Sequence, residues 1–376
     1  MTAGVRSMAA DPELDDLRAS VRQFLANRNS EDTVRALMTT HAGYDEGVWK
    51  QMAQQLGLQG VHIPEEYGGA GFGHVELGIV LEEMGRSLLG GPFFPTVVLA
   101  ANALLLSGDE QAKRRWLPPI AEGNLLATVA FTEDAGSWDP AVVATTAVPA
   151  AGGHELTGTK SFVLDGHTAG LLLVTARTDA GVGVFAVDAD ARGLTRTPLN
   201  TLDQTRRQAT VRLDRTPAVL VGADGGGTEV LTAVLDLAAV GLAAEQVGGA
   251  QRVLDMAVEY AKVRVQFGRP IGSFQAIKHK CAEVLVEVES ARAAMQYALW
   301  CADEHNGELP VVACLAKAYC SETYFRATAE NIQVHGGIGF TWEHPAHLYF
   351  KRAKSSELLF GDAAYHRELL VHRIGI

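Results

Sequence analysis

A turn between two long helical patterns carries the residues best suited to hold an anion. Arg264, Phe267 and Gln275 lie in the run Arg-Val-Gln-Phe-Gly-Arg-Pro-Ile-Gly-Ser-Phe-Gln, whose glycines and proline end one helix and turn the chain. An arginine stays charged and presents a planar pair of donors that suits a pyrophosphate. The alternative is a charged helix turn with one buried ring, because most helix connections carry no chemistry.

A second segment with binding character is Gln333-Val334-His335-Gly336-Gly337-Ile338-Gly339-Phe340. Gly336 and Gly337 would let the backbone approach a ligand closely, because they lack a Cβ atom. The same two glycines could also do no more than end the helix that precedes them. Both interpretations predict that this helix stops at Gly336.

The helical patterns on either side of the turn have long apolar faces. Apolar residues recur at three- and four-residue steps over 247–265 and again over 277–299, which predicts a hairpin of two amphipathic helices. Apolar faces of this length exceed what one hairpin can cover. We therefore expect a dimer of dimers built from this hairpin, with partners that are either identical or homologous.

The rest of the chain changes character twice. Helical patterns extend to about Leu126, with a break at Pro92–Pro95 and a resumption over Leu99–Leu106, and they return from Thr228, where Pro310 predicts the first position of a late helix. Between them, short segments rich in Val, Thr and Phe predict the strands of a small barrel or sandwich. The predicted strands are 128–131, 142–148, 171–176, 182–187 and 210–213. The glycine-rich run 222–227 predicts a linker, since no Gly-Lys-Ser/Thr follows it as a phosphate loop requires.

Composition limits the classes of function. The 376 residues carry a net charge of −12, which argues against nucleic acid as a partner. Four cysteines without CxxC spacing predict free thiols in a reducing cytoplasm. With neither a signal-peptide pattern nor an uncharged apolar run of about 18 residues, we expect a cytoplasmic protein that does not span a membrane. No metal site is expected, because a proline separates His344 from His347 and no carboxylate has ligand spacing.

Three segments together resemble the acyl-CoA dehydrogenase family of flavoproteins. They are Ile63-Pro64-Glu65-Glu66-Tyr67-Gly68-Gly69, the pattern Tyr-Ala-x-x-Arg-x-x-Phe-Gly-x-x-Ile-x-x-x-Gln that starts at Tyr260, and the segment from Gln333 to Phe340. They keep the family's order and spacing, and the similarity covers nearly the whole chain. The resemblance implies an α+β multidomain fold. Its parts are an N-terminal helical domain at 1–127, a middle β-barrel or sandwich domain at 128–221, and a C-terminal four-helix bundle at 228–376 that builds a homo- or hetero-tetramer.

The resemblance also implies that each FAD is bound between two subunits. The residues that by position would hold a neighbour's FAD are Arg264, Phe267, Gln275, Gln333, Gly336 and Gly337. The half that would face the chain's own flavin departs from the family. Phe131-Thr132-Glu133-Asp134-Ala135-Gly136-Ser137 is similar to the family's Thr-Glu-Pro-x-x-Gly-Ser, with Asp134 in place of proline. There Phe131 and Thr132 would contact the flavin and Ser137 the CoA side.

Two further substitutions affect the same half. Phe162 and Leu164 take the places of the family's flavin-binding tryptophan and threonine. A leucine side chain cannot donate the hydrogen bond that threonine offers to the ring. An ordinary strand without ligand contacts is therefore the alternative interpretation of this stretch.

The catalytic base has no obvious position. Family members desaturate an acyl-CoA thioester with a glutamate that removes the α-proton, and the usual positions of that glutamate are occupied here by Phe360 and Ala238. Asp362 is a weak candidate, and a helix N-cap is the better interpretation of this residue. The remaining nearby carboxylates are those of Asp236, Glu245 and Glu357.

Three functions remain open from the sequence. The first is an FAD-dependent acyl-CoA dehydrogenase in fatty-acid or sterol side-chain catabolism, with an electron-transfer flavoprotein as acceptor and a base at an unassigned position. The second is the base-lacking subunit of a heteromeric acyl-CoA dehydrogenase, which completes a partner's FAD site. The third is a different flavin oxidase on the same fold. The departures at Phe162, Leu164 and Phe360 favour the second hypothesis.

Overall fold

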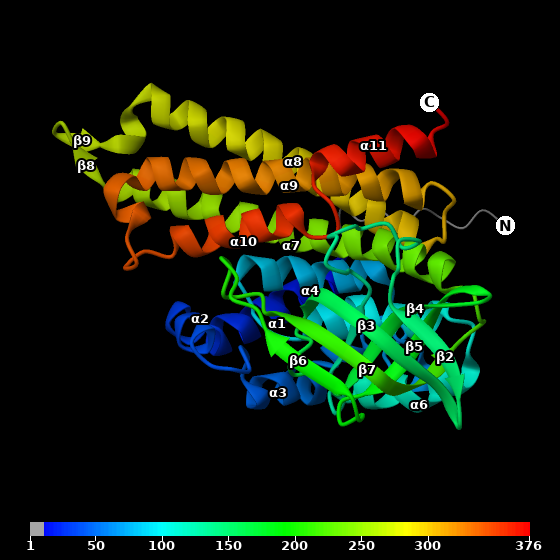
Figure 1. Ribbon diagram of the computed structural model, residues 1–376. Coiled ribbons are helices and arrows are strands. Elements are labelled where there is room, and N and C mark those ends of the chain that lie inside the picture. The colour runs from blue at the N-terminus through cyan, green and yellow to red at the C-terminus, as the bar shows by residue number, and fades with distance from the viewer. Residues whose placement is uncertain (1–10) are drawn as a thin grey trace.

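The computed structural model describes residues 11–376, which form helical, β and helical parts in chain order (Figure 1). The N-terminal helices are α1 (Pro12–Arg28), α2 (Glu31–Met38), α3 (Glu46–Leu56), α4 (His74–Arg86), α5 (Asn102–Leu106) and α6 (Glu110–Ala121), with a π-helix at Phe94–Ala101 before α5. Four of them begin at a side chain that accepts a hydrogen bond from a backbone N–H of the first turn, which satisfies a group that has no partner within the helix. These capping residues are Asp11, Ser30, Asp45 and Asp109.

The predicted break at Pro92–Pro95 is wrong in its position. The helical segment before α5 includes Pro95 in its first turn. There the missing N–H of a proline has no helical partner to lose, so the residue is tolerated. The chain is therefore helical well before Leu99, where the sequence predicted the helix to resume.

The middle part is a seven-stranded sheet that closes into a barrel. Its strands are β1 (Ala127–Ala130), β2 (Thr146–Ala150), β3 (Gly153–Leu164), β4 (Leu171–Thr178), β5 (Gly181–Asp188), β6 (Leu194–Pro198) and β7 (Gln208–Val221). The order β1-β4-β2-β3-β7-β5 is closed by pairing of β5 with β4, and β6 pairs with β7. The strand predicted at 142–148 is observed as β2 but begins four residues later, because pairing with β3 starts only at Thr146. Strand β6 was not predicted because only its first residue is strongly apolar.

The C-terminal helices are α7 (Gly227–Val263), α8 (Gln275–Asp303), α9 (Leu309–His335), α10 (Ala346–Leu358) and α11 (Ala363–Arg373). The predicted hairpin is confirmed as α7 and α8, joined by the short strands β8 (Val265–Gln266) and β9 (Arg269–Pro270). Gly336 ends α9 with a φ of 67°, as predicted, whereas Pro310 is the second residue of this helix rather than the first. All four cysteines are free thiols.

Helix α7 is the centre of the molecule and contacts α4, α8 and α9. By length and composition it could cross a membrane, but 78% of its most apolar stretch is buried inside the protein, as in a core helix. Its contact with α4 is made through glycines. A Cβ atom at Gly248 would lie 1.8 Å from the carbonyl oxygen of Glu82, and one at Gly85 would lie 2.0 Å from that of Glu245. The two helices therefore touch backbone to backbone.

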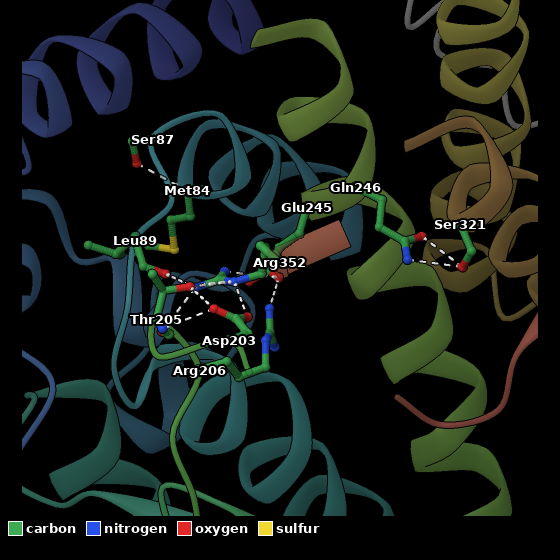
Figure 2. Close-up of polar contacts among 10 residues, drawn as sticks. All are labelled: Met84, Ser87, Leu89, Asp203, Thr205, Arg206, Glu245, Gln246, Ser321 and Arg352. Atoms are coloured by element: carbon green, nitrogen blue, oxygen red, sulfur yellow. Dashed lines mark hydrogen bonds and ion pairs between the residues drawn. The ribbon is translucent and has the colours of Figure 1, made fainter. Parts of the chain in front are cut away.

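A buried ionic network joins the three parts (Figure 2). From α10, the guanidinium group of Arg352 donates to Asp203 Oδ2 at 3.0 Å and to the carbonyl oxygens of Thr205 at 2.9 Å and Leu89 at 3.2 Å. Asp203 and Thr205 belong to the loop before β7, and Leu89 follows α4. Glu245 of α7 lies 4.0 Å from Arg352. Because a buried charge needs partners, this arginine fixes the relative positions of all three parts.

Asp165 lies beside this network without a hydrogen bond to its Oδ1 atom. It is 3% exposed, and burial raises its pKa to about 7, although the charges of Arg206, Arg352 and Arg207 act in the opposite direction. The carboxyl group is therefore protonated in the native state at pH values where an unfolded chain would ionise it. For a carboxyl group with a raised native pKa, stability falls as pH rises from the unfolded pKa to the native one.

We expect the Gly248→Ala variant to lose about 2 kcal/mol of stability or more, because the new methyl group forces α4 and α7 apart. Gly241→Ala in the same helix is the matched control. Its Cβ atom would meet side chains alone, those of Leu81 and Val98 at 3.1 and 3.2 Å and that of Phe94 at 3.7 Å. Urea denaturation followed by circular dichroism measures both. Equal midpoints for the two variants would contradict the backbone contact.

We expect Asp165→Asn to raise the thermal unfolding midpoint more at pH 8 than at pH 5. At pH 8 the native wild type must bury an ionised carboxylate, whereas the amide carries no charge at either pH. The exposed Asp190→Asn is the control and should give the same difference from wild type at both pH values. An Asp165→Asn effect that does not change with pH would contradict the raised pKa.

Candidate functional site

The residues predicted to face a neighbour's cofactor lie at the tip of the α7–α8 hairpin. Arg264 and Gln275 are exposed, and Phe267 is 90% exposed with a φ of 53°. Phe267 is therefore not the buried ring of the alternative interpretation. Val263 and Val265 are exposed beside it, and within residues 11–376 the Arg264 side chain forms no ion pair. An exposed apolar cluster with a free cation fits a contact with another molecule.

The structure brings the second predicted segment to the same end of the bundle. The ring of His335 stacks on that of Tyr260 at 4.3 Å between centroids, which joins the end of α9 to the end of α7. Gln333, Gly336 and Gly337 are exposed. Cβ atoms at the two glycines would have no neighbour within 4 Å, so nothing in residues 11–376 covers this stretch of backbone.

The residues predicted to face the chain's own flavin form a separate group on the barrel. Figure 1 shows β8 and β9 at the end of the bundle far from the barrel, so the two groups do not meet within one chain. Ser161 donates its N–H to the carbonyl of Thr132 at 2.9 Å, which holds the end of β3 beside the segment after β1. Phe131, Thr132 and Leu164 are buried, whereas Phe162 is 44% exposed with a φ of 59°.

Ser137 and the buried ion pair nearby organise the loop after β1. Ser137 Oγ accepts the backbone N–H of Asp139 at 3.1 Å and so turns the chain. Lys160 in β3 is fully buried and donates to Glu133 Oε1 at 2.7 Å. Burial raises the pKa of Glu133, but the Lys160 ammonium and the hydrogen bonds from Thr145 more than offset this and hold that pKa at about 2.

A stack of aromatic rings occupies the place where the family resemblance puts the base. Phe360 is 4% exposed and stacks on Phe94 at 6.0 Å between centroids. The ring of Trp138 meets Phe360 edge-on at 5.8 Å and lies 6.0 Å from Phe131. The guanidinium of Arg206 lies over the Phe94 ring, 5.3 Å from its centroid. The stack includes residues from all three parts of the chain.

A very small cavity lies next to Phe94. It measures about 10 Å³ and is lined in part by Phe94, Leu164, Asp165, Arg206 and Glu245, whereas Phe360 and Trp138 do not line it. A volume of this size holds one water molecule at most. We call the space that the rings of Phe94, Trp138 and Phe360 occupy, where the resemblance puts the base, the chamber.

None of the carboxylates considered as a base is free. Asp362 accepts the N–H of Tyr365 at 2.8 Å, which confirms the predicted N-cap of α11. Glu245 is paired with Arg206, and Asp236 pairs with Arg373 at 2.8 Å. Glu357 pairs with Lys354 at 3.0 Å on the surface. Ala238, the second usual position of the base, is fully buried in α7.

Sequence reasoning missed Trp138, Phe94 and Arg206. Trp138 directly follows the Gly136-Ser137 pair of the matched segment, so an aromatic residue at that point was a signal that the chamber differs. Phe94 and Arg206 carried no such signal, because their contacts are made across domains. Within residues 11–376, no cluster of three His, Cys, Asp or Glu side chains could hold a metal ion.

Comparison with known proteins covers nearly the whole chain. The models of the N-terminal, middle and C-terminal domains of acyl-CoA dehydrogenases match residues 11–124, 128–215 and 225–375. Acyl-CoA dehydrogenase IpdE2 of Mycobacterium tuberculosis is 36% identical over 352 residues, which cover 94% of each chain.

Two solved structures with heteromeric titles are also similar. A chain of the Tcur3481–Tcur3483 steroid acyl-CoA dehydrogenase G363A variant is 35% identical with a TM-score of 0.88, over 96% of this chain and 98% of that one. A chain of the ChsE4–ChsE5 complex from Mycobacterium tuberculosis is 30% identical with a TM-score of 0.88, over 97% and 98%. The fold and reaction class predicted from the sequence are thus confirmed, and the chain belongs to the acyl-CoA dehydrogenase family of oxidoreductases.

Proposed function

We propose that this chain is the base-lacking subunit of a heteromeric acyl-CoA dehydrogenase. In this role it completes the FAD site of a homologous partner subunit, and the partner supplies the catalytic base. The observation that carries the proposal is the position of Phe360, which replaces the glutamate and is packed between Phe94 and Trp138. A ring cannot accept the α-proton, and the rings of Phe94 and Trp138 pack against Phe360 where the base would lie.

The two halves of an FAD site differ in how well they fit this cofactor. When bound, FAD supplies the redox chemistry, and the protein supplies position. The tip of the hairpin fits a pyrophosphate, because Arg264 is charged and exposed and the backbone at Gly336 and Gly337 is uncovered. The half on the barrel does not fit, because Leu164 offers no side-chain donor and the rings of Phe131, Trp138 and Phe360 pack together beside it. This contrast supports a role in a partner's site over a role in the chain's own.

Exposed apolar surface supports assembly with a homologue. On the outer face of α8, Leu285 and Val286 are 47% and 66% exposed, and Tyr297 is 46% exposed. Large exposed apolar side chains on one helix face are typical of an interface. Two similar structures carry titles that name two different chains each. We infer a hetero-tetramer with a base-containing family member.

The wider setting of the reaction is inferred from the same relatives. The substrate class is an acyl-CoA of fatty-acid or sterol side-chain catabolism, since one similar structure is titled a steroid acyl-CoA dehydrogenase. An electron-transfer flavoprotein is the proposed acceptor, and another similar chain comes from a structure whose title names such a flavoprotein. We infer a cytoplasmic complex that binds neither nucleic acid nor membrane, in keeping with the net charge of −12.

The other two functions are less well supported. A self-sufficient dehydrogenase needs a carboxylate that faces the thioester, and each candidate in this chain is engaged in another contact. An oxidase of small carbon acids on this fold would need the same carboxylate beside the flavin. Neither alternative explains the contrast between the two sites. The hairpin tip keeps the residues that resemble the family, whereas aromatic rings fill the chamber where the base would lie.

Activity of the isolated chain is the direct test. We expect it to be slow or inactive towards acyl-CoA, because a general base contributes about 10²–10⁴ in rate. Co-expression with a base-containing homologue should restore turnover. The complex should then hold roughly one FAD per heterodimer, because FAD performs the redox chemistry. Mutation of the partner's glutamate should abolish the activity, whereas Asp362→Asn should have little effect. Turnover by the isolated chain at about 10 per second, an ordinary enzymatic rate, would refute the subunit role.

The contact of Arg264 with the partner's cofactor is tested by FAD content. Arg264→Ala should release flavin from the complex without unfolding the bundle, because an exposed charge contributes little to stability. Arg269→Ala is the matched control on the same turn, since the Arg269 guanidinium lies 4.2 Å from the Phe274 ring centroid and is engaged within the chain. The ratio of flavin to protein absorbance, at 450 and 280 nm, measures how many sites hold FAD. The unmutated complex should hold about one FAD per site. An unchanged ratio for Arg264→Ala would show that this residue does not hold the cofactor.

A further inference from the structure

The short segment between α10 and α11 carries Phe360 in an uncommon backbone conformation. Phe360 has a φ of 61°, and Gly361 follows with a φ of 103°. A non-glycine residue in the left-handed region is disfavoured and persists only where its surroundings hold it there. The segment therefore needs a set of contacts that fixes its backbone.

One such contact is a lysine that is fully buried in α9. Lys317 Nζ donates to the carbonyl oxygens of Glu357 at 3.1 Å and Gly361 at 2.9 Å, on either side of Phe360. Its third partner is Ser321 Oγ at 3.0 Å, which Gln246 of α7 contacts in turn (Figure 2). The amine is thus anchored to the centre of the bundle and binds the segment at two points.

The carbonyl of Phe360 itself is held by His366 of α11. Its Nε2 atom lies 3.0 Å from the carbonyl oxygen of Phe360 and must donate, since a carbonyl only accepts. Burial lowers the pKa of His366 to about 3, so the ring is neutral at working pH. Burial likewise lowers the pKa of Lys317 to about 7. Either form of the amine keeps two N–H donors for the two carbonyls.

We propose that Lys317 and His366 are positioning residues that hold side chain 360 inside the chamber. Their contacts with three carbonyls around Phe360 set the backbone angle that aims this side chain at Phe94 and Trp138. In the complex, they keep the chamber of this chain closed to acyl-CoA, so substrate binds only in the partner's chamber. This inference rests on the proposed function, in which only one chamber per heterodimer is used.

The test uses the complex with a base-containing homologue and the variants Lys317→Met and His366→Leu. Each removes donors to the segment but keeps an apolar side chain of similar size. We expect Phe360 to leave the chamber, so that Trp138 emission shifts to the red and becomes more accessible to acrylamide. Subtraction of the Trp138→Phe complex isolates this signal from that of the other tryptophans. Titration with acyl-CoA should reveal a second binding event per heterodimer that the wild type lacks.

The matched control is Lys354→Met. Lys354 pairs at the surface with the side chain of the same Glu357 whose carbonyl Lys317 holds, so its loss leaves the segment's backbone contacts intact. Loss of thermal stability in Lys317→Met and His366→Leu, with Trp138 quenching equal to that of Lys354→Met, would reduce both residues to a structural role and overturn the proposal. His366→Leu replaces a neutral ring and keeps the test decisive if Lys317→Met fails to fold.

The outcome is separable from that of the proposed function. Substrate stoichiometry and Trp138 quenching report on the closed chamber of this chain, whereas FAD content reports on the partner's site. Full FAD occupancy in both subunits would refute the base-lacking role. One acyl-CoA per heterodimer in both Lys317→Met and His366→Leu, together with unchanged Trp138 quenching, would refute the positioning role alone.

Discussion

The structure depends on the guanidinium group of Arg352. It is 3% exposed and bonds to groups from the barrel loop and from the segment after α4, while it belongs itself to α10. Removal of a charge from water is unfavourable by several kcal/mol, and only a full set of partners offsets this. The three parts must therefore meet in one arrangement. That arrangement brings Phe94, Trp138 and Phe360 together, and it leaves Glu245 committed to Arg206.

The tip of the α7–α8 hairpin and the stack around Phe360 differ in chemical character. At the tip of the α7–α8 hairpin, charge and open backbone are exposed, and the Tyr260–His335 stack keeps the two matched segments in a fixed relation. At the other site, apolar rings and paired ions fill the volume. Complete loss of function would not account for the family-like residues that remain at the hairpin tip beside a well-packed stack around Phe360. The contrast fits a protein that contributes to a site centred in another subunit.

Much of the fold and part of the site could be predicted from the sequence. The α7–α8 hairpin, the end of α9 at Gly336 and the N-cap at Asp362 follow from local patterns of apolar residues, glycine and capping side chains. The absence of the base at Phe360 was visible because its neighbours match the family. The filling of the chamber was not visible, because it depends on contacts between residues far apart in the chain, such as Trp138 with Phe360 and Arg352 with Asp203. The start of the strand predicted at 142–148 was wrong for a related reason, since pairing with β3 sets where it begins.

The contact between Trp138 and Phe360 has a consequence for how such a chain can change over generations. The two rings belong to different domains and pack against each other, so each limits which residues fit at the other position. A glutamate restored at 360 alone would place a carboxylate against the faces of Trp138 and Phe94, where ionisation is disfavoured. A smaller residue at 138 alone would leave an apolar void beside Phe360. Neither single substitution is favourable on its own, so a glutamate at position 360 requires a second change at position 138.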